Sequence, residues 1–108
     1  MTLTVMLVLV WLHFIADFVL QSDRVAVAKS SDNIVLAAHV FIYSLPFIWC
    51  GWQFVAVNAV AHFITDYVTS RITSRLWLKK RHWFFVVIGA DQAIHLSTLF
   101  ATYAWLKP

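Results

Sequence analysis

Seven residues that can bind a metal ion or carry a proton lie inside otherwise apolar stretches of this sequence. They are four histidines and three aspartates: His13, Asp17, His39, His62, Asp66, Asp91 and His95. Six of them form pairs spaced by four residues, and residues at i and i+4 share one face of a helix. Ionisable residues are rare in helices that enter a membrane, so the set predicts a functional site or a buried polar network.

Imidazole and carboxylate groups together are good ligands for a divalent transition metal such as Zn, Mn or Fe. Seven ligands exceed the need of one tetrahedral ion, so we predict one or two ions, with an aspartate bridging a pair. Two-metal sites commonly activate water and clamp phosphate oxygens. The sequence therefore predicts a metal-dependent hydrolase of a phosphoester or a lipid headgroup. His39, as ligand or general base, and Asp91 are the candidate catalytic residues.

Further polar residues extend this predicted site. Gln21 and Asn58 continue two of the polar helix faces by another four positions, where they would orient ligands from outside the metal centre. Four cations at the same end of the apolar stretches are predicted to bind an anionic or lipid substrate: Arg24, Lys29, Arg71 and Arg75.

Two other classes of function use the same seven residues. A proton or metal-ion transporter or channel needs titratable groups at mid-depth in a membrane, although the other half of these stretches is almost wholly apolar. A structural membrane protein would use the His and Asp residues only as a hydrogen-bond network that holds its helices together. Bound metal, substrate turnover and ion flux distinguish the three alternatives.

The elements that carry these residues are strongly apolar. Hydrophobic residues make up 62% and charged residues 12% of the 108-residue chain, against about 45–50% and about 25% in soluble domains. Four apolar runs at 3–20, 34–50, 52–69 and 83–106 approach the length that spans a bilayer. Helices satisfy their own backbone in lipid. We therefore predict an all-α, polytopic four-helix bundle that forms a single transmembrane domain over residues 1–108.

Basic residues predict the orientation of this bundle. Seven of the eight Lys and Arg residues lie in the connecting segments 21–33 and 70–82. The positive-inside rule places both segments in the cytoplasm and both termini outside a bacterial inner membrane. The net charge of +3 is then a matter of topology and does not predict nucleic-acid binding. The predicted partners are the lipid bilayer and an anionic or lipid substrate, and a homo-oligomer is compatible with the small size.

An internal repeat links the two halves of the chain. HFIADFV at residues 13–19 and HFITDYV at residues 62–68 are identical at five of seven positions, with an offset of 49 residues. The first and third runs would cross the membrane in the same direction, so we predict a parallel repeat about an axis along the membrane normal. Each half would be one helical hairpin, and the two His-x-x-x-Asp faces would meet near that axis.

The connections between the runs carry boundary signals. The polar cluster at residues 30–33 predicts an N-cap for the second helix. Pro46 predicts a kink near the end of that helix, and Gly51 predicts a tight turn after it.

Several of these motifs together resemble those of a known family. They are His13-x-x-x-Asp17-Phe18-x-Leu20-Gln21, Lys29, His39, His62-x-x-x-Asp66 and Asp91-Gln92-x-x-His95. The pattern resembles a family of small bacterial and phage membrane proteins catalogued as domain of unknown function 3307, over nearly the whole chain. The resemblance brings no established activity, but it implies that Gln21, Lys29 and Gln92 belong to the site, with Gln92 orienting ligands. A weaker likeness, in style and without a motif match, is to membrane-bound metal-dependent hydrolases.

Overall fold

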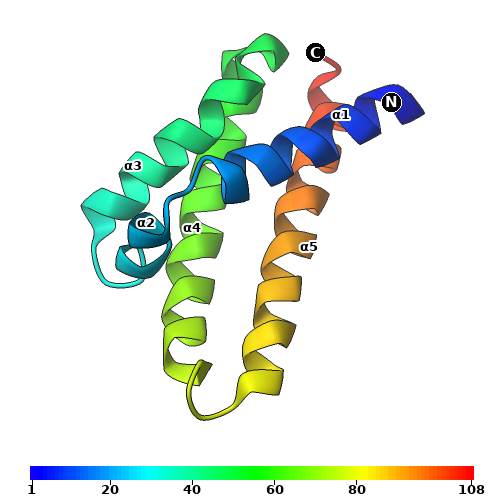
Figure 1. Ribbon diagram of the computed structural model, residues 1–108. Helices are drawn as coiled ribbons and strands as arrows, with labels where there is room; N and C mark the ends of the chain where they lie inside the picture. The colour runs from blue at the N-terminus through cyan, green and yellow to red at the C-terminus, as the bar shows by residue number, and fades with distance from the viewer.

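The computed structural model describes residues 1–108 and contains helices but no strand, which confirms the predicted all-α class (Figure 1). There are five α-helices: α1 (Leu3–Phe14), α2 (Asp23–Ala28), α3 (Asn33–Ser44), α4 (Trp52–Leu76) and α5 (Arg81–Leu106). A π-helix, Ile15–Val19, continues α1, and a 3-10 helix, Leu45–Cys50, continues α3. The four predicted apolar runs therefore correspond to helical segments. Helix α2 was not predicted, because it lies within the polar connection 21–33.

Helix boundaries follow the local signals in the sequence. Asp32 caps α3 through its side chain, which accepts hydrogen bonds from two N–H groups of the first turn. Pro46 has no N–H to donate to an α-helical bond, and the chain changes to a 3-10 helix there. Gly51 has a φ of 92°, which side chains rarely adopt, and it turns the chain into α4. The predicted cap and glycine turn are thus confirmed, and the kink predicted at Pro46 corresponds to a change of helix type.

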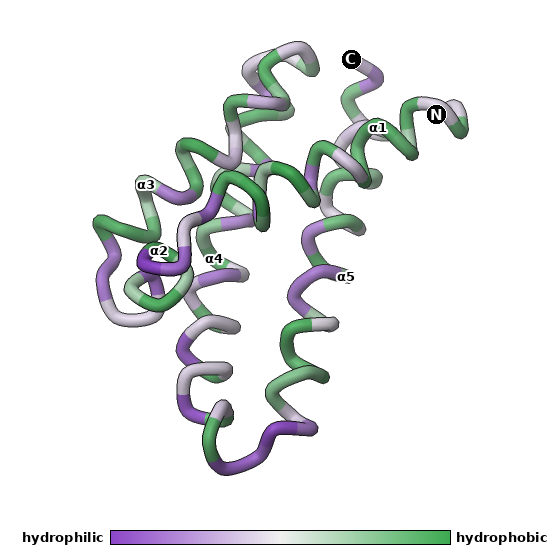
Figure 2. The backbone as a smooth tube through the Cα atoms, viewed as in Figure 1, coloured by the Kyte–Doolittle hydropathy of each residue, from purple (hydrophilic) through white to green (hydrophobic).

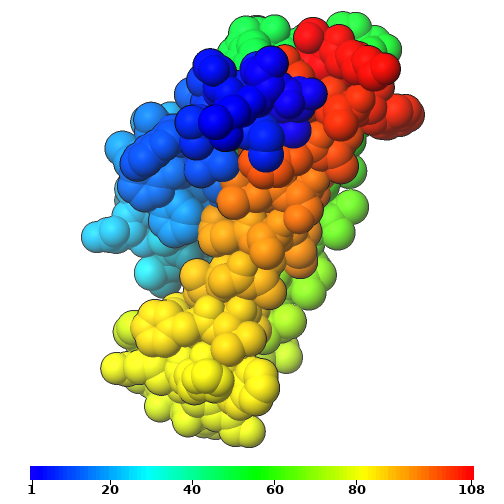
Figure 3. Space-filling view, turned by 90° about the vertical axis from the view of Figure 1, so that its right-hand side faces the viewer, coloured from blue at the N-terminus to red at the C-terminus, as the bar shows by residue number.

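α4 and α5 form a long antiparallel hairpin, and α3 packs against α4 (Figure 1). α1 lies obliquely and contacts α5, while its π-helical continuation contacts α3. Both termini lie at one end of the molecule, and the α4–α5 turn lies at the opposite end. Figure 3 shows this turn projecting beyond the rest of the chain.

Polarity is reversed relative to a soluble domain, in which buried residues are mostly apolar. Eleven of the 20 buried residues are polar or charged, whereas all six tryptophans are exposed. The main apolar core is small and consists of Leu9, Ala16, Tyr43, Phe47, Cys50, Phe54 and Leu99. Figure 2 shows the most hydrophilic chain around α2 and at the α4–α5 turn.

Two segments, Asn33–Cys50 and Arg81–Leu106, are long and apolar enough to cross a membrane by length and composition alone. Leu3–Val19 is apolar but shorter. α4 has 25 residues, yet it does not meet the same criterion because it carries buried polar residues such as Asn58, His62 and Asp66. Two of the four predicted spans therefore meet this criterion.

Candidate metal centre

The structure brings all seven predicted His and Asp residues into one buried cluster. Each is at most 6% exposed. They come from α1 and its π-helix, α3, α4 and α5. They form three overlapping groups in which one ligand atom per residue lies within 4.8 Å of the others: Asp17, His39, His62 and Asp66; His13, Asp17 and His95; Asp66, Asp91 and His95. Each of these groups has the residue types and the spacing to hold a metal ion.

The first group, which we call the tetrad, has the dimensions of a tetrahedral site. His39 Nε2 lies 3.0 Å from Asp17 Oδ1, 3.2 Å from His62 Nε2 and 3.4 Å from Asp66 Oδ2. His62 Nε2 lies 3.5 Å from Asp17 Oδ1 and 3.2 Å from Asp66 Oδ2. Zinc ligands at about 2.0–2.1 Å from a tetrahedral ion are about 3.3–3.4 Å from one another. Five of the six edges of the tetrad are therefore close to the length that such an ion imposes.

The two repeated aspartates each face two groups. Asp17 Oδ1 and Asp66 Oδ2 belong to the tetrad. The other oxygen of Asp66 lies 3.5 Å from His95 Nε2, and the other oxygen of Asp17 lies 3.9 Å from His95 Nδ1. His95 Nδ1 is also 3.3 Å from Asp91 Oδ2. Asp66 is therefore shared by the tetrad and the group with Asp91 and His95, and Asp17 is shared by the tetrad and the group with His13 and His95.

Several ring nitrogens of the cluster have no hydrogen-bond partner. Both nitrogens of His95 and Nδ1 of His62 are buried and form no hydrogen bond, although carboxylate oxygens lie 3.3 and 3.5 Å from the two nitrogens of His95. Buried polar atoms are nearly always paired in native proteins, so an unpaired group calls for an explanation such as a bound ion. A metal ion beside His95 would supply a partner for one of its nitrogens.

The charge of the cluster also favours a cation. Lys29 Nζ donates to Asp66 Oδ2 at 2.9 Å and is the one Lys or Arg side chain paired with the cluster. Three carboxylates and one ammonium leave two negative charges when the imidazoles are neutral. Uncompensated charge is costly in a buried site. One divalent cation, or two protonated histidines, would balance it.

His13 has a different environment from its repeat equivalent, His62. Gln92 Nε2 donates to Asp91 Oδ2 at 2.9 Å, which turns Gln92 Oε1 toward His13 Nε2 at 2.6 Å. An amide oxygen only accepts, so His13 Nε2 carries the proton, and His13 Nδ1 accepts from the Tyr43 hydroxyl at 2.8 Å. Both ring nitrogens of His13 are thus engaged. His13 lies at ligand distance from the cluster, but in this structure it positions Gln92 and Asp91.

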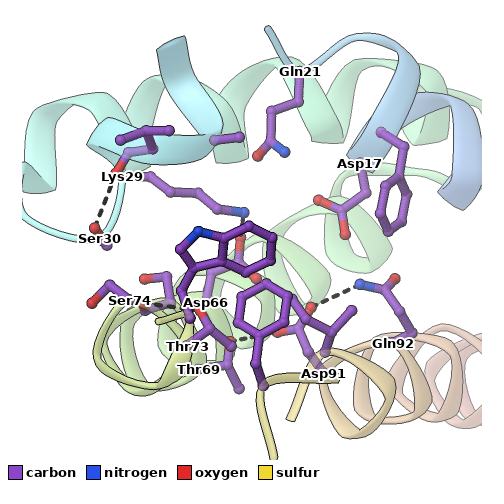
Figure 4. A pocket seen from close by; sticks show the side chains of 17 residues that line it. Asp17, Gln21, Lys29, Ser30, Asp66, Thr69, Thr73, Ser74, Asp91 and Gln92 are labelled. Atoms are coloured by element: carbon purple, nitrogen blue, oxygen red, sulfur yellow. Dashed lines mark hydrogen bonds and ion pairs between the residues drawn. The ribbon is translucent and has the colours of Figure 1, made fainter. Parts of the chain in front are cut away.

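A cavity of about 480 Å³ opens from the cluster toward the α4–α5 turn (Figure 4). Asp17, Asp66 and Asp91 line its inner end, together with Lys29, Gln21 and Gln92. Hydroxyl groups of α4 form one wall, contributed by Thr69, Ser70, Thr73 and Ser74. Trp77 and Phe84 line its outer, more apolar end. None of the four histidines of the cluster lines this cavity, so a ligand in it would meet the carboxylates first.

A family model described as a protein of unknown function, DUF3307, matches residues 4–107. The chain belongs to this family. The match spans α1 to α5, so the cluster and the cavity lie within the family's domain. Comparison with curated proteins and with solved structures finds no match. The family resemblance drawn from the motifs is thus confirmed, whereas the likeness to metal-dependent hydrolases receives no support from the comparisons.

Most of the Gln, Asn, Lys and Arg residues that were predicted to surround the cluster of this DUF3307 chain lie away from it. Of the four predicted substrate-binding cations, only Lys29 lines the cavity. Arg71 instead donates to Asn33 Oδ1 at 2.7 Å and stacks on Tyr67, and two further cations, Arg24 and Arg75, are exposed. Gln21 and Gln92 line the cavity as the resemblance implied.

Asn58 is buried in α4, as its helix face predicts, but its amide donor does not bond to the His and Asp residues of the cluster. Its Nδ2 donates to the Phe54 carbonyl of the preceding turn at 3.0 Å. The structure therefore gives Asn58 a local bond within α4 in place of the predicted ligand-orienting contact.

Several residues with hydroxyl groups lie at the site although they were not predicted there. Tyr43 contacts His13 from α3, and Thr69 donates to Asp91 Oδ1 at 2.6 Å. Ser70 and Thr73 extend the cavity wall. Ser70 lies four positions beyond Asp66, so continuing the polar period of α4 would have found it. Tyr43 follows His39 by four residues, but an aromatic residue in an apolar run gives no signal of a polar contact.

Loss of the Tyr43 hydroxyl should disturb the hydrogen-bond chain through His13. We expect Tyr43→Phe to lower the free energy of unfolding by about 1–2 kcal/mol, because His13 Nδ1 would lose its donor in a buried site. Tyr103→Phe is the matched control, since Tyr103 packs on the apolar core and does not contact His13. Unfolding of detergent-purified protein measures both. Equal stability of the two variants would contradict this role of Tyr43.

Proposed function

We propose that this protein is a multi-pass membrane protein with a divalent metal centre near its cytoplasmic face, and that the centre hydrolyses a phosphoester. The observation that carries the proposal is the tetrad, in which two histidines and two aspartates from three helical segments have five of their six separations at 3.0–3.5 Å. Ion pairs that serve only packing have no reason to converge on the edge lengths of one coordination polyhedron.

Membrane insertion is supported by where the polar and apolar residues lie. Only 33% of Asn33–Cys50 and 17% of the apolar window of α5 are buried inside the molecule. The core helix of a soluble protein would be mostly buried. Lipid can cover the remaining apolar surface, whereas water would leave it exposed. The polar interior then fits the rule that ionisable residues of membrane helices face the interior of the bundle.

The proposed topology has four spans, Leu3–Val19, Asn33–Cys50, α4 and α5, arranged as two repeated hairpins. The basic segments 21–33 and 70–82 would be cytoplasmic and both termini outside, by the positive-inside rule. The termini and the α4–α5 turn lie at opposite ends of the molecule, as this arrangement requires (Figure 1). α2 would lie at the cytoplasmic surface.

Site-directed labelling tests the topology. In a Cys50→Ala background, we expect Lys107→Cys to react with a membrane-impermeant maleimide in intact spheroplasts. We expect Ser31→Cys and Lys80→Cys to react only after the membrane is opened, because both would lie on the cytoplasmic side. All three side chains are exposed and lie just beyond the ends of the proposed spans. Labelling of Lys80→Cys from outside, or protection of Lys107→Cys, would contradict the orientation.

The tetrad is the proposed primary metal site. Two imidazoles and two carboxylates at tetrahedral spacing favour Zn, with Mn or Fe as alternatives. One divalent ion would neutralise the two residual negative charges of the cluster. His95 could hold a second ion together with Asp66 and Asp91, or together with His13 and Asp17. Such ions polarise phosphoryl oxygens and activate water.

The residues of the cavity have separate proposed roles. Lys29 would bind the anionic phosphoryl group, since it is the only Lys or Arg that lines the cavity. Asp91 would accept a proton from the attacking water, because it faces the cavity and is held by Thr69 and Gln92. His39 does not line the cavity, so we assign it the role of ligand.

Metal content provides the first test of the proposed site. We expect wild-type protein, purified without chelator, to retain at least one Zn, Mn or Fe ion per chain. His62→Ala should lose most of it because the tetrad then has three ligands. His82→Ala is the control, since His82 is exposed in the α4–α5 turn region. Elemental analysis that finds no metal in wild type would favour the structural hydrogen-bond network.

Turnover tests the hydrolase itself. We expect metal-loaded protein to hydrolyse 4-nitrophenyl phosphate, and Asp91→Asn to slow it by about 10²–10⁴-fold through loss of the proton acceptor. Asp23→Asn, at an exposed aspartate of α2, should leave the rate unchanged. Metal content is measured on each variant to separate ligand loss from loss of the base. Equal rates for Asp91→Asn and wild type would contradict the assignment.

The alternative function is a transporter or channel. The cavity supports it because ions could reach the carboxylates from the end of the molecule that carries the α4–α5 turn. The opposite side of the cluster is closed by apolar side chains, among them Tyr43, Phe47 and Phe54, each at most 2% exposed. A path through the bilayer would have to open this core. Proteoliposomes that conduct protons or metal ions without a hydrolysable substrate would favour transport.

A further inference from the structure

The cavity contains buried polar atoms that have no partner within the chain. Ser70 is 8% exposed, and its Oγ is buried without a hydrogen bond. Gln21 Oε1 is also buried and unpaired. Both side chains line the cavity, Ser70 from α4 and Gln21 from the connection before α2, and Figure 4 shows Gln21 beside it. Buried polar atoms are normally satisfied, so these two indicate that a ligand completes them.

The polar groups of the cavity require both hydrogen-bond donors and hydrogen-bond acceptors from this ligand. An amide oxygen such as Gln21 Oε1 only accepts, so the ligand must offer a hydroxyl or N–H group there. The ammonium of Lys29 only donates, and one of its N–H groups already bonds to Asp66, so its remaining N–H groups can bond to a ligand oxygen such as that of a phosphoryl group. Ser70 Oγ can donate or accept. Inorganic phosphate would satisfy Lys29, but it is one compact group, whereas a phosphoester of a polyol offers a phosphoryl group and separate hydroxyl donors for Gln21 and Ser70.

The outer end of the cavity adds an apolar requirement. Trp77 and Phe84 meet edge to face with ring centroids 4.7 Å apart, and both line the cavity. A volume of about 480 Å³ lies within the range of small-ligand sites, about 300–1,000 Å³. A polar headgroup fits this space, and an apolar group attached to it would extend out of the cavity alongside the Trp77 and Phe84 rings.

We propose that the cavity binds the phosphoester of a hydroxylated carrier, either the glycerol phosphate headgroup of a lipid or a soluble polyol phosphate. The phosphoryl group lies beside Lys29 and the carboxylates, and the carrier hydroxyls bond to Gln21 and Ser70. The remainder of the carrier lies toward Trp77 and Phe84. This inference rests on the proposed function, since it places the phosphoryl group at the metal end of the cavity.

Calorimetry on protein as purified in detergent tests this assignment with four probes: glycerol 1-phosphate, glycerol, inorganic phosphate and lysophosphatidylglycerol. We expect glycerol 1-phosphate to bind more tightly than glycerol or phosphate alone. Ser70→Ala and Gln21→Met should each weaken its binding by about five- to tenfold through one lost hydrogen bond. Ser44→Ala is the matched control, because Ser44 bonds to the Val40 carbonyl of its own helix and lies outside the cavity.

The probes also separate the two sources of the ligand. Binding of lysophosphatidylglycerol at least tenfold tighter than that of glycerol 1-phosphate assigns a lipid headgroup, and similar affinities assign a soluble phosphoester. Phosphate binding as tightly as glycerol 1-phosphate, no binding of any probe, or unchanged affinity in both Ser70→Ala and Gln21→Met would overturn the inference.

Turnover of 4-nitrophenyl phosphate, measured on the same samples, distinguishes this inference from the proposed function. Ser70-dependent binding without turnover contradicts only the hydrolase. Turnover with binding that does not depend on Ser70 or Gln21 contradicts only the assignment of the carrier.

Discussion

The carboxylates of Asp17 and Asp66 lie within 4.8 Å of each other in the interior, and the rest of the structure accommodates their charge. Two like charges in a low-dielectric interior are costly unless cationic or hydrogen-bonding groups surround them. α3 contributes His39, α4 contributes His62, and the connection after α2 contributes Lys29. The relative positions of the helices are therefore tied to this polar centre as much as to the small apolar core.

This centre divides the molecule into two unlike halves. Toward the termini, aromatic and aliphatic side chains such as Phe47, Phe54 and Leu99 fill the space between the helices. Toward the α4–α5 turn, a hydroxyl-lined cavity replaces them. A ligand can therefore approach from one side only, and the carboxylates that it meets are already held by Thr69, Gln92 and Lys29. This asymmetry favours a binding site over a continuous path.

The sequence predicted the members of the cluster because its signal is local. A His and an Asp four residues apart in an apolar run define one polar helix face. Three such faces and His39 are expected to meet in the interior of the bundle, because ionisable residues of apolar helices face inward. Helix ends were equally predictable from Asp32, Pro46 and Gly51, which act within one turn. These signals depend on covalent neighbours, so a single sequence contains them.

The remaining features depend on contacts between distant parts of the chain. Gln92 and His13 are 79 residues apart, and Lys29 and Asp66 are 37 apart. No spacing rule shows that Lys29 points inward while Arg71 binds Asn33 on the surface. The rotation of each helix decides these partners. The π-helix at Ile15–Val19 illustrates this limit, because the seven-residue repeat gives no sign of it.

In the π-helix, the Leu20 N–H bonds to the Ile15 carbonyl, five residues back, whereas the corresponding segment of α4 stays α-helical. One residue corresponds to about 100° of rotation in an α-helix. The wider turn therefore gives Asp17 a different helical phase from that of Asp66, although their sequence contexts nearly match. A duplicated motif has in this way become two inequivalent halves, in which His62 faces the tetrad and His13 faces Gln92.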